Sequence, residues 1–314
     1  MTKIAMPLFL IIASSAHVAS AQVPAQAAVP AIVGGGYSIP NQMLRAAPGQ
    51  VMSLMIYGLS YTVQTPVVAA ATPLPTTLAG FSASLKQTAL SAPIPIPLLS
   101  IQQQSQCTPS YLGGPCPVLT ILSLQIPFEA VTAGNCGACG PPPILSALVV
   151  SQDGVEQTSV PVDILSDNLH VTSSCDTTLV ANSGGSCTKY ITHGTGIVVD
   201  SLHPAVQGEE LAVYAFGLGA PATATTGHLT LMGAAALPVD SVTVTFEFPA
   251  SVSPISTHPA YVGLVPGFVA LYQINVRVPN SNTSLPGCNT NGANATMAII
   301  AANSQDSTGI CVMP

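Results

Sequence analysis

Apolar residues recur at every second position in two stretches of the C-terminal half. In the segment 242–248, apolar residues hold every even position and polar residues hold every odd one. The segment 268–278 is likewise apolar at its even positions. Successive side chains of a strand point to opposite faces, so each segment predicts a strand with one buried face. The side chains expected in the core are Val242, Val244, Phe268, Tyr272, Ile274 and Val276.

Turn signals separate further short strands along the chain. The segments 144–150 and 155–165 flank Asp153-Gly154, a dipeptide typical of tight β-hairpins. The segments 295–302 and 308–312 flank a polar turn in the same way. No amphipathic helix longer than two turns is evident. Many short strands with turns between them predict antiparallel sandwiches.

The chain repeats itself at a distance of about one domain. The segment 48–59 returns in looser form as 206–218, and the segment 122–127 has a counterpart in 272–279. Two copies in the same order indicate two similar folded units in tandem. We therefore predict an all-β protein with two tandem Ig-like antiparallel β-sandwich domains. The expected parts are a first sandwich at 36–165, an interdomain segment with a Cys175/Cys187 loop at 166–200, and a second sandwich at 201–314.

The first residues are typical of a secretory signal peptide. A positive charge precedes the apolar residues 4–13, and Ala19-Ser20-Ala21 is a cleavage site of small residues. A membrane anchor is the alternative, but Pro7 interrupts an apolar stretch that is already short for a bilayer. We expect residues 1–21 to be removed on export and residues 22–35 to form a leader or linker. No transmembrane segment is expected after that cleavage.

The charge balance excludes one class of partner. The chain has 12 acidic and 5 basic residues, and charged residues make up only 5% of it. Because nucleic-acid affinity comes from clustered Lys and Arg, no nucleic-acid partner is expected. Ser, Thr, Asn and Gln must instead supply most of the polar surface.

The cysteines favour disulfides, since there are eight of them in a chain that is expected to be exported. Many pairings are possible, and the pairing that closes the shortest loops joins neighbours in the sequence. The candidate pairs are Cys107–Cys116, Cys136–Cys139, Cys175–Cys187 and Cys288–Cys311. The first three would pin loops, and the fourth would tie the last two strands of the second domain.

Several motifs between residue 36 and the end resemble a known family. They are Ala47-Pro48-Gly49-Gln50-Val51, the segment 72–80, Pro204-Ala205-Val206-Gln207-Gly208-Glu209, the segment 214–219 and the segment 263–276. Together they are similar to the tandem Ig-like, IPT/TIG-like C-terminal region of bacterial exported proteins, the Solibacter-type C-terminal domain family. The resemblance implies an Ig-like fold and supplies no assigned activity or catalytic residue. This chain departs from the family in its extra cysteines and its long Cys107–Cys116 loop.

Cys136-Gly137-Ala138-Cys139 is the segment most open to a chemical interpretation. A C-x-x-C pair can be a redox centre when a helix follows it and lowers a thiol pKa. Here Pro141-Pro142-Pro143 follows and no βαβ pattern surrounds the motif, which favours a structural loop disulfide. Zinc needs about four ligands. Neither a second C-x-x-C nor an H-x-x-x-H motif is present, so no metal or cofactor is expected.

The histidines lie in no recognised catalytic motif. There is no H-E-x-x-H sequence and no G-x-S-x-G elbow for an acyl nucleophile. A Ser-His-Asp triad assembled from distant segments stays open, because its members need not be close in sequence. The simpler expectation is that the five histidines that remain after removal of residues 1–21 lie in loops or at the surface: His170, His193, His203, His228 and His258.

Acidic residues near the predicted interdomain segment could supply oxygen ligands for Ca²⁺. They are Asp163, Asp167 and Asp176, with Glu209 and Glu210 at the start of a predicted strand. No D-x-[DN]-x-[DN]-G loop is present, so solvated loops are the simpler interpretation.

These observations favour an exported, non-enzymatic structural or binding module of the cell surface, extracellular space or periplasm. An extracellular protein or a polysaccharide is the expected partner, recognised by loops and strand edges. The first loops to consider are Tyr111-Leu112-Gly113-Gly114 and the Cys136–Cys139 loop. The alternative is a secreted hydrolase, or a thiol-disulfide oxidoreductase that uses Cys136 and Cys139.

Overall fold

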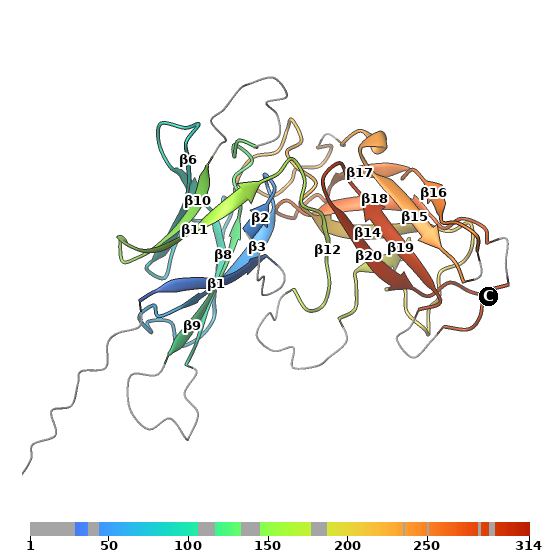
Figure 1. The fold of residues 1–314 in the computed structure, drawn as a ribbon, viewed down its shortest axis with the longest axis horizontal. Coiled ribbons are helices and arrows are strands. Elements are labelled where there is room, and N and C mark those ends of the chain that lie inside the picture. Colours follow the sequence, from blue (N-terminus) through green and yellow to red (C-terminus); the bar gives the residue numbers. More distant parts are fainter. Residues whose placement is uncertain are drawn as a thin grey trace, which may run out of the picture.

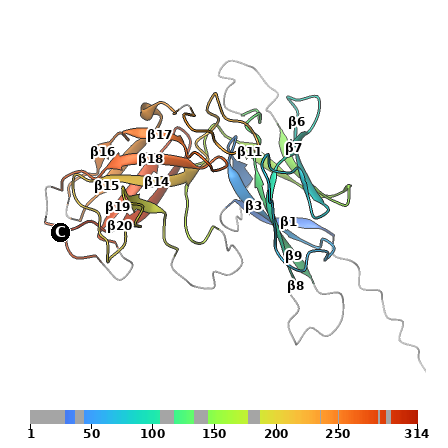
Figure 2. The same cartoon turned by 180° about the vertical axis from the view of Figure 1, so that it is seen from behind.

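Two β-rich bodies lie side by side along the long axis of the molecule (Figures 1 and 2). The computed structural model describes residues 29–36, 44–105, 117–132, 145–176, 187–234, 236–249, 251–281, 284–288 and 293–314. In these ranges the chain forms β-strands and one short 3-10 helix, Val239–Ser241. None of the helical structure in these ranges is long or apolar enough to cross a membrane.

The first domain consists of two sheets packed face to face. One sheet has the order β1 (Ala31–Gly36), β3 (Val51–Tyr57), β9 (Val118–Gln125), β8 (Leu98–Ser105) and β4 (Val67–Val68). The other has the order β2 (Leu44–Ala46), β11 (Val155–Ile164), β10 (Ser146–Gln152), β6 (Phe81–Gln87) and β5 (Thr77–Leu78), with β7 (Ile94–Ile96) also on β6. Buried side chains from both sheets form one continuous core.

The second domain repeats this plan. Its first sheet has the order β12 (His170–Val171), β14 (Glu210–Phe216), β18 (Tyr272–Arg277) and β17 (Tyr261–Leu264), with β13 (Ile191–His193) also on β14. Its second sheet has the order β16 (Ile255–Thr257), β15 (Thr243–Glu247), β19 (Ala295–Ile300) and β20 (Gln305–Ile310). The second core lies between these two sheets.

The predicted fold class is confirmed. Val242, Val244, Ile274 and Val276 are all buried, as their alternation with polar residues predicted. The strands pair antiparallel almost throughout, and the parallel pairing of β2 with β11 is an exception. The predicted turn at Asp153-Gly154 joins β10 to β11, and both of its residues have the positive φ that a tight hairpin needs.

The internal repeat has a simple structural meaning. Its segments form β3 and β9 in the first domain and β14 and β18 in the second, and each pair lies side by side inside a sheet. Leu54 stands opposite Leu122, and Val213 stands opposite Ile274. All four side chains are buried, so each repeated pair supplies the centre of one domain's core.

The prediction that Phe268 lies in the core is wrong. Its strand, β18, begins only at Tyr272, and the Phe268 side chain is 54% exposed. Positive φ angles at Gly267 and Ala270 turn the backbone before the strand starts. The alternation of inward and outward side chains therefore does not extend back to Phe268.

The segment 166–200, expected to link the domains, contributes two strands to the second domain. In this segment β12 and β13 both pair with β14. Leu169, Val171 and Ile191 belong to the second core. The expected leader at 22–35 also ends inside a strand, because β1 pairs with β3. Strands of two or three residues are too short to show an alternating pattern, and so the sequence did not reveal β12 and β13.

The two domains are held together at the connection between β11 and β12. The Gln50 side-chain amide donates to the carbonyl of Asn168 at 3.1 Å. In return, the Asn168 side chain donates to Gln50 Oε1 at 3.0 Å and to the carbonyl of Arg45 at 3.1 Å. The Asn168 N–H donates to the Gly217 carbonyl of the second domain at 2.8 Å. Asn168 thus contacts both domains at once.

A loop of the second domain makes the other contact with the first domain. The Thr226 hydroxyl accepts the Phe128 N–H at 2.8 Å and donates to the Glu129 carboxylate at 2.6 Å. The Gly227 N–H donates to Gln125 Oε1 at 2.7 Å. The Gly227 carbonyl accepts the N–H of Leu74 at 2.7 Å. Hydrogen bonds on two separate segments fix the orientation of one sandwich against the other.

Candidate functional site

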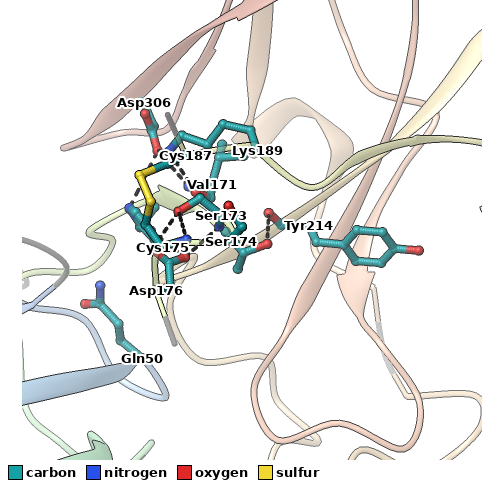
Figure 3. Close-up of polar contacts among 12 residues, drawn as sticks. Gln50, Val171, Ser173, Ser174, Cys175, Asp176, Cys187, Lys189, Tyr214 and Asp306 are labelled. Carbon is teal, nitrogen blue, oxygen red and sulfur yellow. Dashed lines mark hydrogen bonds and ion pairs between the residues drawn. A yellow bond between two sulfur atoms is a disulfide. The ribbon is translucent and has the colours of Figure 1, made fainter. Parts of the chain in front are cut away.

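A cluster of charged side chains joins the two sheets of the second domain (Figure 3). Asp306, on β20, accepts the N–H of Val171 on β12 at 2.7 Å and a hydrogen bond from Lys189 Nζ at 3.0 Å. Lys189 Nζ also donates to the Val171 carbonyl at 2.8 Å. These side chains are about four-fifths buried. They therefore satisfy backbone groups at the edge where β12 and β20 meet.

A histidine and a second aspartate extend this cluster. His170 Nε2 lies 3.0 Å from Asp176 Oδ2, and His170 Nδ1 lies 3.7 Å from Asp306 Oδ2. The Ser173 N–H donates to Asp176 at 2.7 Å. Burial alone would raise the pKa of Asp176, but the His170 side chain and the Ser173 donors outweigh it and hold that pKa below 3.8.

The arrangement does not activate a nucleophile. The Ser173 hydroxyl donates to Asp176 Oδ1 at 2.9 Å, so it faces a carboxylate and not an imidazole nitrogen. In a Ser-His-Asp triad the histidine lies between the other two groups. Here the aspartate has that place, and it receives hydrogen bonds from both neighbours. The chemistry of this cluster is that of a structural crosslink.

The second domain contains two disulfides among the described residues, and one of them adjoins these groups. Cys175, between Ser173 and Asp176 in the sequence, is bonded to Cys187 with a Cα–Cα distance of 5.3 Å. Cys288 is bonded to Cys311 near the end of β20, with a Cα–Cα distance of 5.6 Å. Both are pairs that the sequence predicted. The first one fixes the segment that carries Asp176, and it lies beside Lys189 in Figure 3.

Asp167 forms a separate polar centre at the β19–β20 turn. Its carboxylate accepts the Asn303 N–H at 3.0 Å and the Ser304 hydroxyl at 2.6 Å. Asp167 is only 5% exposed. The expectation that Asp167 and Asp176 lie in solvated loops is therefore wrong, because each one anchors backbone N–H groups that the sequence could not assign to it.

The histidines divide into two groups. His203, His228 and His258 are exposed, as expected. His170 and His193 lie on β12 and β13, and their side chains are only 18% and 16% exposed, so the expectation of loop or surface positions is wrong for them. Strands this short leave no alternating pattern in the sequence, so the partly buried positions of these two histidines could not be predicted from it. In the described part of the chain, no group of three or more His, Cys, Asp or Glu side chains is arranged to hold a metal ion.

An exposed apolar surface lies beside the junction between the domains. It consists of Leu229, Leu231, Met232 and Phe268, which are 42%, 78%, 87% and 54% exposed. The Thr230 N–H donates to the Phe268 carbonyl at 2.9 Å, which ties the two segments of this surface together. We call these four side chains the apolar surface.

Leu229, Leu231 and Met232 of the apolar surface line a hollow to which both domains contribute. The hollow has a volume of about 380 Å³, and its walls include Phe128 of the first domain with Leu264 and Ala270 of the second. The run Leu229-Thr230-Leu231-Met232 was visible in the sequence. No sequence pattern marks it as a surface, because apolar runs in a β protein usually predict core strands.

The loop residues proposed from the sequence lie outside the described residues. They are Tyr111, Leu112, Gly113 and Gly114, together with Cys107, Cys116, Cys136 and Cys139. The binding role of the first loop and the chemistry of the C-x-x-C pair therefore stay predictions.

Comparison with known proteins adds little to this geometry. No protein-family profile matches the chain, and no curated protein is found to be similar. Among solved structures, the C-terminal domain of the Streptococcus agalactiae AgI/II polypeptide BspA is similar over 90% of this chain and 98% of that chain. The sequence identity is 12% and the TM-score is 0.19. A likeness of this degree supports no conclusion about function, which has to be argued from the side chains.

Proposed function

We propose that this chain is an exported, non-enzymatic binding module that recognises a protein through its apolar surface. Contiguous apolar side chains at the surface of a soluble domain typify sites of protein interaction. Leu231 and Met232 are more than three-quarters exposed, although the domain has a complete core elsewhere. Two disulfides support a place outside the cytosol, where such bonds persist.

A protein partner fits this surface better than a polysaccharide does. Polar groups around a flat aromatic ring favour sugar recognition, whereas this surface has three aliphatic or thioether side chains and a single ring. Leucine and methionine adapt to irregular apolar partners, and methionine is common at adaptable binding surfaces. The hydrogen bonds of Thr226 and Gly227 hold the adjoining loop on the first domain, so the surface is presented by a fixed frame.

The test is a binding assay on arrays of purified extracellular proteins and polysaccharides. We expect the native chain to bind a protein target and a Leu231→Ser/Met232→Ser double variant to lose at least about tenfold in affinity, since buried apolar anchors dominate interfaces. Val252→Ser is the matched control, because Val252 is fully exposed in a different loop. Equal binding by the double variant, or binding to polysaccharides alone, would contradict the proposal.

The described residues offer no specific support for the alternative of a hydrolase or thiol oxidoreductase. The Ser173 hydroxyl is directed at a carboxylate. Cys136 and Cys139 lie in a part of the chain that the structure does not describe. A thiol titration of the native protein tests the oxidoreductase directly, because resistance of every cysteine to mild reductant would contradict it.

A further inference from the structure

His193, on β13, bridges two other segments of the second domain. Its Nδ1 lies 2.6 Å from Oε1 of Glu209, which is in the turn before β14. Its Nε2 lies 3.2 Å from the carbonyl oxygen of His203, which is in the loop after β13. The side chains of His193 and Glu209 are 16% and 23% exposed, so water competes only weakly for these hydrogen bonds.

The two partners of this ring place a condition on its protonation. A carboxylate and a backbone carbonyl both accept hydrogen bonds, and neither can donate one. A neutral imidazole carries one N–H and can satisfy only one of them. The imidazolium form carries two N–H groups and satisfies both. The geometry around His193 is therefore complete only when the ring is protonated.

Among the described residues, the two charged groups that raise the pKa of His193 are carboxylates, Glu209 and Asp200. Glu209 lies at hydrogen-bond distance, and Asp200 lies in the same loop as His203. Burial alone would lower the pKa of His193, but the Glu209 carboxylate, the His203 carbonyl and Asp200 outweigh it and raise that pKa above 6.5. The ring of His203 lies 3.1 Å from Asp200 Oδ1, whereas the His203 carbonyl is the group at hydrogen-bond distance from His193.

We propose that His193, Glu209 and the carbonyl of His203 form a proton-dependent latch that holds the segment 194–206 against the turn before β14. Glu209 contacts both sides, because its Oε2 accepts the Val206 N–H at 2.9 Å. The His203 carbonyl also accepts the Asp200 N–H at 3.1 Å. Loss of the proton forces one of the two ring contacts to break, and that loosens the segment.

The raised pKa of His193 determines whether the latch is closed at low or at high pH. A histidine with a raised pKa in the folded state contributes stability that is complete below its ordinary value of 6.5. That contribution is lost as the pH rises through the folded-state pKa. The latch is thus closed in mildly acidic surroundings and opens toward alkaline pH. The segment that it controls carries Leu202, which is 82% exposed. This inference is independent of the proposed partner of the apolar surface.

The test combines two measurements on the full chain between pH 5.5 and about 9, a range that brackets the ordinary histidine pKa. An NMR titration follows the His193 ring, and hydrogen exchange, corrected for its intrinsic pH dependence, follows the Asp200 and Val206 amides. We expect the pKa of His193 to lie above 6.5, the ordinary value for a histidine. We expect the protection of both amides to fall roughly tenfold as His193 loses its proton, since charge-assisted hydrogen bonds are the stronger ones.

Two variants separate the latch from a general effect of pH. Glu209→Gln keeps an acceptor for Val206 but removes the charge, and we expect it to abolish the pH dependence of amide protection. His203→Gln removes a ring but keeps the carbonyl, and we expect it to leave the pH dependence unchanged. A pKa of His193 at or below 6.5 in the native chain, or an unchanged pH dependence in Glu209→Gln, would overturn the proposal. The His193 titration in the native chain still tests the latch if a variant fails to fold.

Discussion

Gln50 and Glu209 occupy the same position in their two domains and make the same local contact. Gln50 Oε1 accepts the N–H of Ala47 at 2.8 Å, and Glu209 Oε2 accepts the N–H of Val206 at 2.9 Å. Each residue therefore closes a turn over three positions with its own side chain. What differs is the second partner, because Gln50 reaches Asn168 at the domain junction and Glu209 reaches His193. The same turn thus contacts the domain junction in the first domain and a histidine in the second. The side chain that makes the contact is an amide in the first turn and a carboxylate in the second.

The glycines of these two turns make a matched pair for mutation. Gly49 and Gly208 have φ angles of +78° and +85°, and their N–H groups donate to equivalent carbonyls of the neighbouring strand. A Cβ on Gly208 would meet no atom within 4 Å, whereas a Cβ on Gly49 would lie 2.0 Å from the Phe128 ring. The backbone N–H of Phe128 donates to Thr226, which fixes the main chain that carries this ring.

We therefore predict that Gly49→Ala destabilises the protein more than Gly208→Ala does. Gly208→Ala should lower the free energy of unfolding by about 1–2 kcal/mol, the cost of left-handed backbone for a residue with a Cβ. Gly49→Ala should add a steric cost to that and disturb the domain junction. Urea unfolding followed by tyrosine fluorescence measures both variants. Equal losses would show that the Phe128 ring yields freely.

The junction itself can be loosened at Thr226. Thr226→Val keeps the shape of the side chain but removes the acceptor of the Phe128 N–H and the donor to Glu129. We expect a loss of about 1–3 kcal/mol at the interface, because the partly buried N–H of Phe128 is left without its acceptor. Small-angle scattering should then report a wider spread of interdomain distances. Thr225→Val is the control, since Thr225 is exposed on the same loop, and an unchanged scattering profile in Thr226→Val would count against this role.

The sequence predicted those parts of the fold that depend on many residues of one strand. The alternation at 242–248 placed β15, and the repeat of 48–59 at 206–218 identified β3 and β14 as equivalent strands. Such predictions hold because a strand with one buried face must separate its apolar and polar side chains. The turn at Asp153-Gly154 was predictable for the same local reason.

The candidate sites could not be predicted in the same way. In the cluster, Asp306 contacts Lys189 and His170, each more than a hundred positions away in the sequence. These three residues form no motif of fixed spacing. The alternation of apolar and polar residues at 268–278 predicted a buried Phe268. It does not reveal that the backbone turns at Gly267 and Ala270, before the strand begins. The exposure of Leu231 and Met232 depends on where a loop leaves the sheet, which no local pattern encodes.

Asp176 should govern part of the acid stability of the second domain. The donors from His170 and Ser173 hold its pKa below 3.8, and they outweigh the opposing effect of burial. A carboxyl with a lowered folded-state pKa contributes stability that is complete above its unfolded-state value and is lost as the pH falls through the folded-state one. Asp176→Asn should therefore flatten the decline of stability below about pH 4. Urea midpoints between about pH 2 and 5 test this, and parallel curves for the variant and the native chain would contradict it.

The last prediction compares two ion pairs that differ in burial. The pair of Lys189 and Asp306 is about four-fifths buried and also satisfies the Val171 backbone, whereas the pair of Lys86 and Glu156 is about half exposed. Asp306→Ala leaves a lysine and a backbone N–H without their acceptor in a partly desolvated place, so we expect a loss of about 2–3 kcal/mol. Glu156→Ala should cost about 0.5 kcal/mol or less, because water and salt screen a surface pair. Thermal unfolding in low and high salt distinguishes the two, since salt should weaken only the effect of Glu156→Ala. Similar losses from both substitutions would mean that Asp306 does not close the edge between β12 and β20.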